Sequence, residues 1–103
     1  KAINGIKSSN GKMVNVADDE ILEMMRILGR TTGVFGEPAG VAGLAGLKKM
    51  IKKGKISPDE TVVNVITGNG LKDVKNAIKA AGSPLKVEAD LDKLTNIFEE
   101  KKK

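Results

Sequence analysis

The pattern of apolar and polar residues predicts helices separated by short extended segments. Residues 18–30 carry apolar side chains at the three- and four-residue spacing that lines one face of a helix: Ile21, Met24, Met25 and Leu28. We interpret the two methionines as core filler rather than as an adaptable binding surface. Asp18 is the expected N-cap of this helix, because an acid beside the first turn favours the helix dipole.

Two shorter helices are expected near the ends of the chain. The first spans 2–9 and stops at Asn10 and Gly11, which tolerate the left-handed backbone of a helix end. The second spans 90–99. Its apolar face is expected to hold four residues: Leu91, Leu94, Ile97 and Phe98.

The stretch 61–73, TVVNVITGNGLKD, is the one around which we expect the chain to be organised. Its β-branched apolar run has too little alternation for a half-exposed strand, so we predict a strand buried on both faces of a sheet: Val62, Val63, Val65 and Ile66. The strand stops at Thr67. A helix over 71–81 is expected to follow, with Val74, Ala77, Ile78 and Ala81 as its buried stripe.

Shorter strands are expected over 12–16 and 84–87. The predicted fold class is therefore α/β, with helices packed on a small, mostly parallel sheet. So few strands make an incomplete sheet, and edge strands of this kind need partners from more chain. We expect residues 1–103 to form a single domain or a fragment of a larger one.

The segment 33–46, GVFGEPAGVAGLAG, predicts a glycine-rich helix that starts at Glu37 and Pro38. Gly40, Gly43 and Gly46 recur every three residues, although each glycine costs roughly 1 kcal/mol of helix stability relative to alanine. We favour close packing of this face on a neighbouring element as the compensation. The alternative is a helix N-terminus that faces a ligand, because free N–H groups there attract anions.

The turn after the central strand is the candidate site. In open α/β sheets, ligands bind outside the carboxyl ends of the strands, where this chain places Thr67, Gly68, Asn69 and Gly70. The alternative is an ordinary strand-to-helix turn in which glycine and asparagine serve only the backbone geometry.

Composition excludes several classes of function. Among 103 residues there is no cysteine and no histidine, which removes disulfides, thiol nucleophiles, histidine-based triads and the usual zinc sites. We expect no metal site and no membrane partner, since no apolar run is long enough to span a bilayer. The net charge of +5 invites nucleic acid, but with only two aromatic residues and lysines gathered at helix ends, the sequence disfavours it.

Two stretches together, GVFGEPAGVAGLAGL and ETVVNVITGNGLKD, resemble the C-terminal part of threonine synthase, a pyridoxal-phosphate enzyme of fold type II (tryptophan synthase beta-like). The lead-in VADDEILEMMRILGRTTG and the closing segment PLKVEADLDKL are similar to the flanking segments of that family. One departure is Ala17, where the family often has a serine. The TGNGLKD sequence distinguishes this chain from the related dehydratases and racemases, which share an EP-type segment.

The resemblance implies part of a cytoplasmic, homodimeric enzyme that converts O-phospho-L-homoserine and water to L-threonine and phosphate with pyridoxal phosphate. It assigns Thr67, Gly68, Asn69 and Gly70 to the cofactor site, with Glu37 lining the same region. In this fold type the hydroxyl at the Thr67 position meets the pyridine nitrogen of the cofactor. A neutral hydroxyl can donate to an unprotonated ring nitrogen, and the two glycines let the backbone turn beside the ring.

The family's Schiff-base lysine and phosphate-binding loop lie earlier in the enzyme and have no counterpart in this sequence. We therefore expect a C-terminal portion of three-layer architecture that supplies one wall of the site, needs the portion N-terminal to it, and is inactive alone. The absence of an initial methionine fits this expectation. Alternatives are a threonine or serine dehydratase-like fragment and a non-catalytic basic binding module.

Overall fold

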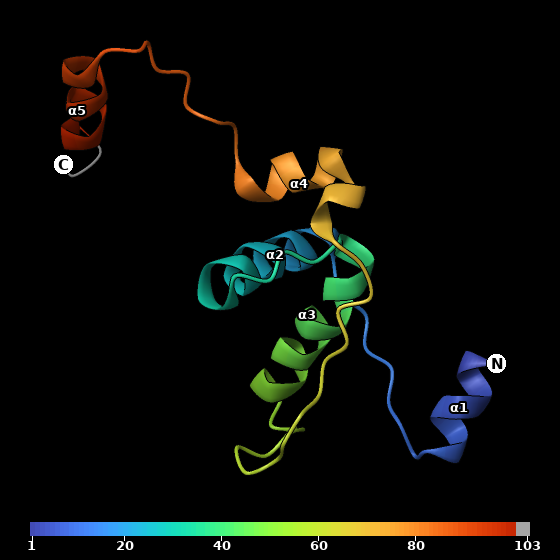
Figure 1. Cartoon of the computed structure of the whole chain (residues 1–103). Helices are drawn as coiled ribbons and strands as arrows, with labels where there is room; N and C mark the ends of the chain where they lie inside the picture. The colour runs from blue at the N-terminus through green and yellow to red at the C-terminus, as the bar shows by residue number, and fades with distance from the viewer. Residues whose placement is uncertain (101–103) are drawn as a thin grey trace.

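The computed structural model describes residues 1–100, which form five α-helices and one 3-10 turn. The elements are α1 (Ala2–Ser8), α2 (Asp18–Thr32), α3 (Pro38–Lys52), η1 (Gly70–Lys72), α4 (Val74–Ala81) and α5 (Leu91–Glu100). Helices α2, α3 and α4 meet in the middle of the molecule, whereas α1 and α5 stand apart at the two ends (Figure 1). The resulting shape is elongated, with extents of 61 × 29 × 21 Å.

No β-strand forms among residues 1–100, so the three predicted strands are not confirmed. Residues 12–16, 61–67 and 84–87 are extended chain without a ladder partner, and the bridge described is an isolated one between Gly36 and Asn69. The central segment is also far from buried, with Val63 84% and Val65 71% exposed. A strand needs a neighbour to satisfy its backbone groups, and none of these segments lies in register beside another.

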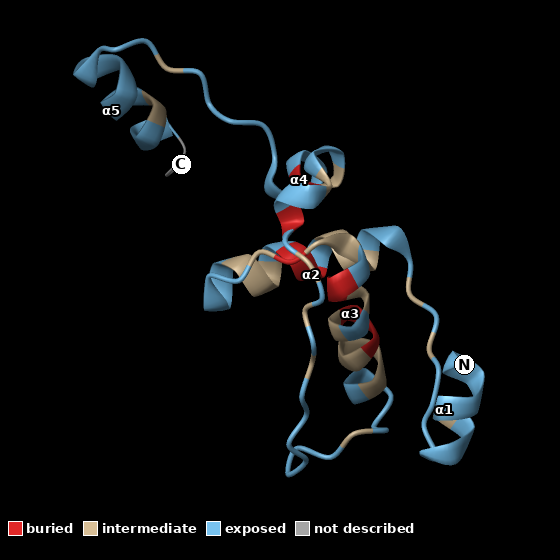
Figure 2. Ribbon diagram, turned by 45° about the vertical axis from the view of Figure 1, so that its right-hand side comes forward, coloured by how far each residue is buried: buried red, intermediate tan, exposed pale blue. Residues whose placement is uncertain are grey.

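The core lies where α2, α3 and α4 meet, and Figure 2 shows buried residues gathered at this junction. Met24 and Met25 of α2 pack there, which confirms their interpretation as core residues. The other buried members of this cluster are Val41, Ala45 and Ala80. The core is small because alanine supplies two of its five buried side chains.

The glycine face of α3 packs closely on the extended segments that flank it. A Cβ atom placed on Gly43 would lie 2.8 Å from Asn64 Oδ1, and one placed on Gly46 would lie 2.8 Å from Val14 Cγ1. Close approach, the favoured explanation for the glycine repeat, is therefore confirmed at both positions. Helix α3 begins at Pro38 as predicted, and Gly54 adopts a φ of +63° just beyond its end.

The start of α2 differs from the prediction, because Ala17 and not Asp18 occupies the N-cap position. Glu20 takes the capping role from within the first turn, since its Oε2 accepts a hydrogen bond of 2.8 Å from the Ala17 N–H. At the end of α1, Asn10 has a φ of 54°, which confirms the predicted left-handed stop.

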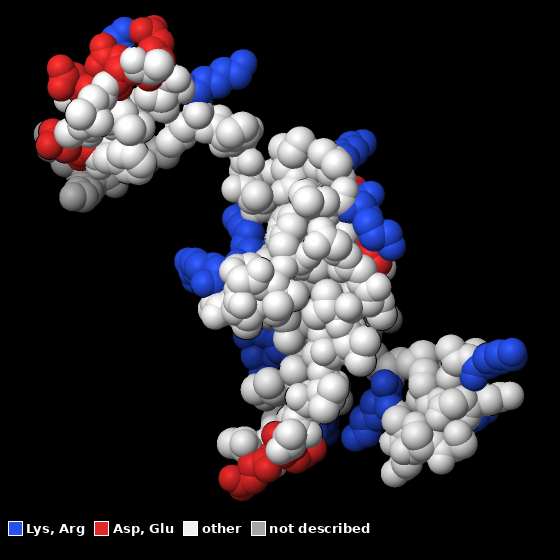
Figure 3. All heavy atoms as spheres, viewed as in Figure 1, with Lys and Arg blue, Asp and Glu red and all other residues white. Residues whose placement is uncertain are grey.

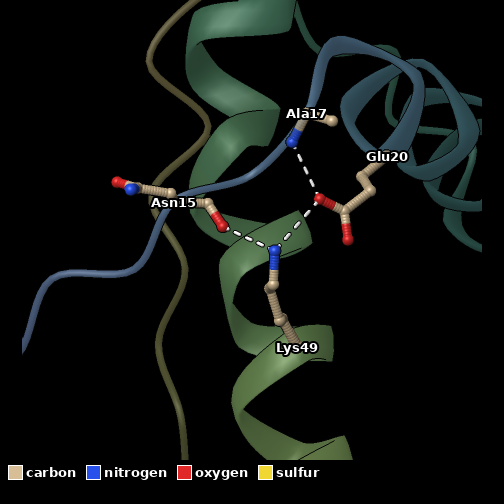
Figure 4. Close-up of polar contacts among 4 residues, drawn as sticks. All are labelled: Asn15, Ala17, Glu20 and Lys49. Atoms are coloured by element: carbon tan, nitrogen blue, oxygen red, sulfur yellow. Dashed lines mark hydrogen bonds and ion pairs between the residues drawn. The ribbon is translucent and has the colours of Figure 1, made fainter.

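A lysine of α3 ties this cap to the chain before it (Figure 4). Lys49 Nζ donates to Asn15 O at 2.8 Å and lies 3.4 Å from Glu20 Oε2. The Ala17 N–H, followed by Lys49, lowers the pKa of the Glu20 carboxyl below its usual range. Beside it, the hydrogen bond from Lys48 lowers the pKa of Glu23.

The predicted helix over 71–81 forms in two pieces, η1 and α4, with Asp73 between them. Asp73 Oδ1 accepts from the Asn76 N–H at 3.1 Å and starts α4 at Val74. The predicted buried stripe is wrong except at Ala77. Ala77 and Ala80 face the core, whereas Val74 and Ile78 are 58% and 53% exposed, because α4 approaches α2 through its smallest side chains.

Helix α5 confirms the predicted last helix but not the burial of its stripe. Leu91 is 76% exposed and Phe98 is 58% exposed, because α5 packs on nothing in the described part of the chain. The extended residues 82–90 separate it from α4 (Figure 1). No helix within residues 1–100 has both the length and the apolar character needed to cross a bilayer.

Candidate functional site

The candidate site forms where the turn after the central segment meets the chain that leads into α3. The Gly70 N–H donates to Phe35 O at 2.8 Å, and the Glu37 N–H donates to Gly68 O at 2.8 Å. These two bonds form the isolated antiparallel bridge between Gly36 and Asn69. Two stretches more than thirty positions apart in the printed sequence are therefore held side by side by backbone hydrogen bonds.

The turn itself is stabilised by its own polar side chain. Asn69 Oδ1 accepts a hydrogen bond of 2.9 Å from the Leu71 N–H, which starts η1. The Asn69 side chain therefore has a local structural role that explains its place in the turn without a ligand.

Both glycines of the turn are required by neighbours in this chain. A Cβ atom on Gly68 would overlap the carboxylate of Glu37, and one on Gly70 would lie 2.5 Å from the Phe35 ring. Neither glycine has a positive φ, so the requirement is for space and not for an unusual backbone conformation. A side chain at Gly70 would collide with the Phe35 ring, whereas one at Gly68 would meet the end of the flexible Glu37 side chain, which can move aside.

The carboxylate of Glu37 lies over the turn with its side chain 18% exposed. Lys72 Nζ, from η1, lies 3.4 Å from Glu37 Oε2 and is the cation nearest to it among the described ion pairs. This arrangement places one negative and one positive group at the rim of the turn. The exposed position of Lys72 keeps the attraction modest, since water screens exposed pairs.

The N-terminus of α3 closes the site from the other side. A Cβ atom on Gly40 would lie 3.0 Å from Thr67 N and 3.2 Å from Thr67 Oγ1. Gly40 therefore serves the close approach of helix and turn, which is the packing role predicted for the glycine repeat. It also leaves the Thr67 hydroxyl beside the first turn of the helix.

A shallow hollow of about 390 Å³ opens on the turn. It is lined by Gly33, Val34, Phe35, Ile66, Gly68 and Asn69. Thr67 is not among these lining residues: it is exposed, its Oγ1 lies on the side of Gly40, and its hydroxyl makes no hydrogen bond within residues 1–100. The hollow is lined by glycines and Asn69 as well as by apolar side chains, and the Thr67 hydroxyl lies beside the N-terminus of α3.

The structure thus brings together the five residues predicted for the site: Glu37, Thr67, Gly68, Asn69 and Gly70. The sequence reasoning missed Phe35, which contacts Gly70, and Lys72, which pairs with Glu37. The signal for Phe35 was its position as one of two aromatic residues, between glycines and directly before Glu37-Pro38. Within residues 1–100, acidic side chains form no cluster able to hold a metal ion.

Comparison with known proteins identifies the family. Residues 1–68 match the family described as pyridoxal-phosphate dependent enzyme. The threonine synthase of Methanocaldococcus jannaschii is 44% identical over 100 residues, covering 97% of this chain and 25% of that protein. The threonine synthase of Bacillus sp. is 48% identical over 79 residues, covering 77% of this chain and 22% of its own length.

The threonine synthase of Methanosarcina acetivorans is 41% identical over 92 residues, which cover 89% of this chain and 23% of that protein. The chain thus spans about a quarter of the length of these relatives and matches their C-terminal portion. This chain belongs to the pyridoxal-phosphate-dependent enzymes and corresponds to a C-terminal part of such a protein.

Proposed function

We propose that this chain is the C-terminal part of a threonine synthase, which converts O-phospho-L-homoserine and water to L-threonine and phosphate with pyridoxal phosphate. The observation that carries the proposal is the joining of Glu37 to the turn Thr67–Gly70 through paired backbone hydrogen bonds. The relatives named above support the reaction, because all three are threonine synthases.

In this proposal Thr67 binds the ring nitrogen through its hydroxyl. The lack of a side chain at Gly40 leaves room for that hydroxyl beside the first turn of α3, and Val34 and Ile66 of the neighbouring hollow supply apolar surface for the ring. When bound, pyridoxal phosphate supplies an electron sink for the substrate's α-carbon. A neutral hydroxyl at the nitrogen leaves the ring unprotonated, so Thr67 limits the strength of that sink.

The remaining site groups belong to the portion of the enzyme N-terminal to this chain, including the lysine that anchors the cofactor. Exposed valines on 61–67 support this division, because the central segment carries a strand's apolar residues without a strand's neighbours. The chain alone is therefore inactive, and the complete enzyme is a homodimer of the cytoplasm that carries a larger three-layer domain.

A fusion tests the proposal directly. The N-terminal three quarters of the Methanocaldococcus jannaschii relative would be joined to this chain and compared with the chain alone. We expect the fusion to bind pyridoxal phosphate, with a visible absorption band, and to release phosphate from O-phospho-L-homoserine, while the chain alone does neither. A site-specific cofactor adduct with turnover in the chain alone would overturn the division of the site.

Thr67 is tested in the same fusion. Thr67→Val keeps the shape of the side chain and removes the hydroxyl, so we expect turnover to fall at least tenfold and the cofactor absorption band to shift. Thr67→Ser should retain most of the activity, and Thr61→Val is the matched control on the same segment. Unchanged turnover and an unchanged band in Thr67→Val would remove Thr67 from the mechanism.

Two other functions give different results in these assays. A dehydratase-like enzyme would release ammonia from threonine or serine and leave O-phospho-L-homoserine intact. A basic binding module would bind an anionic partner with an affinity that falls steeply as salt rises, and the fusion would show neither cofactor band nor turnover.

A further inference from the structure

Two features of the structure remain unexplained, an apolar hollow on α2 and the amphipathic helix α5, which covers no other element within residues 1–100. The hollow, of about 560 Å³, lies at the C-terminal half of α2. Its apolar lining comes from Met25, Ile27, Gly29, Phe35 and Ala81, and its polar lining comes from Glu23, Arg26 and Arg30. Helix α5 carries the apolar stripe Leu91, Leu94, Ile97 and Phe98, which is exposed or only partly buried.

We propose that α5 docks into this hollow and that its apolar stripe covers Ile27 and Phe35, which are only partly buried. The occupant is thus a segment of this chain, and the argument does not depend on the reaction proposed above. Three observations support it: the tether between the two parts, the match of their charges, and the position of Phe35.

The tether starts at the hollow itself. Ala81, the last residue of α4, lines the hollow, and α5 begins at Leu91. The intervening residues 82–90 span at most about 30 Å when fully extended, and α5 is about 15 Å long. Gly82, with a φ of +86°, marks the point where the chain leaves α4 and can change direction. The linker is long enough to turn back and lay α5 across the hollow.

The charges of the two surfaces are complementary. Arg26 and Arg30 are one helical turn apart on α2, and neither forms an ion pair within residues 1–100. On α5, Asp92 and Glu99 are seven residues apart and flank the same side of the apolar stripe. Figure 3 shows acidic side chains gathered around α5. Glu23, the acid on the hollow, is already paired with Lys48 at 2.8 Å.

Docking of α5 in this hollow would affect the candidate site through Phe35. Phe35 lines the hollow on one side, and on the other its ring and carbonyl contact Gly70 of the turn. A helix seated on the hollow would hold Phe35 against Gly70. Helix α5 would therefore act as a strap that supports the turn from behind without touching a ligand.

Paired spin labels test the docking, and the absence of native cysteine makes the labelling clean. Labels would be placed at Thr31→Cys, beyond the hollow on α2, and Asn96→Cys, on the polar side of α5. We expect a narrow distance distribution below about 25 Å, because α5 is only about 15 Å long and lies beside α2 when docked. A broad distribution at longer distances in a chain whose circular dichroism remains helical would overturn the proposal.

Two sets of variants separate docking from accidental proximity. Leu94→Ser with Phe98→Ser should abolish the short distance. Arg26→Glu with Arg30→Glu should weaken it, and adding Asp92→Arg with Glu99→Arg should restore it, whereas Glu100→Gln on the opposite side should have no effect. Failure of the reversed charges to restore the distance would remove the arginine contacts from the proposal.

The same labels in the fusion protein distinguish the occupant. A short distance in both proteins supports docking of α5. A short distance in the isolated chain that is lost in the fusion would show that the N-terminal portion takes the hollow, and would overturn the proposal for the whole protein. This result is independent of cofactor binding and turnover, so failure of the proposed reaction leaves it unaffected.

Discussion

The junction of α2, α3 and α4 and the segment 61–67 have similar apolar character but opposite burial. Met25 and Val41 are fully buried at the junction, whereas Val63 and Val65 are mostly exposed. The helices satisfy their backbone hydrogen bonds internally and meet partners nearby in the chain. The extended segment forms no ladder among residues 1–100, so its exposed backbone groups are left to water.

The difference teaches that burial in this chain follows the availability of partners and not hydrophobicity. Segment 61–67 is well placed all the same, because Gly40 and Gly43 draw it onto α3 from one side. The side of the segment that faces α3 is packed, whereas Val63 and Val65 are exposed. The same contrast separates α4, which packs through alanines, from α5, which has an equally clear apolar stripe and no contact.

Met25→Ala should have the largest effect, because it removes a fully buried side chain from a small core. We expect a loss of about 2–5 kcal/mol of stability, measured by urea unfolding of the chain. Ile51→Ala, at a position that is 53% exposed on α3, is the matched control and should change stability little. Similar losses for both would mean that the junction is not the core.

Val63→Ser should have different effects on the stability of the isolated chain and of the fusion protein. At 84% exposure the change should alter the free energy of unfolding of the chain by less than about 0.5 kcal/mol. In the fusion described above, a partner strand would bury Val63, and the loss should rise to about 1.5–3 kcal/mol. An equally small effect in both proteins would contradict the incomplete-sheet interpretation.

Gly40→Ala and Gly29→Ala sharpen the comparison between packed and open glycines. A Cβ on Gly40 meets the Thr67 backbone at 3.0 Å, so we expect a loss of about 1–3 kcal/mol from overpacking. A Cβ on Gly29 has only ordinary contacts, the nearest at 3.8 Å, so its better helix propensity should stabilise the chain by up to about 1 kcal/mol. Thermal unfolding of both variants should show a lower melting temperature for Gly40→Ala and an unchanged or higher one for Gly29→Ala.

Asp73→Ala should weaken the start of α4. The Asp73 carboxylate accepts from both the backbone N–H and the side chain of Asn76, and its loss should destabilise α4 by about 1 kcal/mol. Asp73→Asn keeps an N-capping side chain and should restore most of the stability. Amide hydrogen exchange of α4 measures the effect. Equal protection in the original chain and both variants would show that the Asp73 cap does not stabilise α4.

The smallest effect should be an acid dependence. Hydrogen bonds lower the pKa of Glu20 below its ordinary value of 4.5, so the folded state binds fewer protons than the unfolded state as pH falls through this range. The stabilisation is complete above about pH 4.5 and is lost as pH falls toward the lowered pKa. Glu20→Gln removes the titrating carboxylate and should therefore make the decline of stability between pH 5 and 3 shallower, an effect that solvent screening keeps small.

The sequence by itself determined the helices and most of their ends, and it predicted residues for the candidate site whose roles stay a prediction. Apolar spacing placed α2 and α5, proline and glutamate placed the start of α3, and glycine placed its end. These features depend on local physics, since helix hydrogen bonds and caps are made within a few residues. The resemblance to threonine synthase was also readable, because it depends on the order of short motifs.

Only the tertiary structure decided what each element meets. It replaced the predicted sheet with extended chain, moved the buried face of α4 to Ala77 and Ala80, and left the stripe of α5 exposed. It also placed the Glu37 carboxylate over Gly68 and paired it with Lys72. These contacts join residues far apart in sequence. Local spacing cannot predict them, because burial and strand pairing depend on which other segment lies beside the residue.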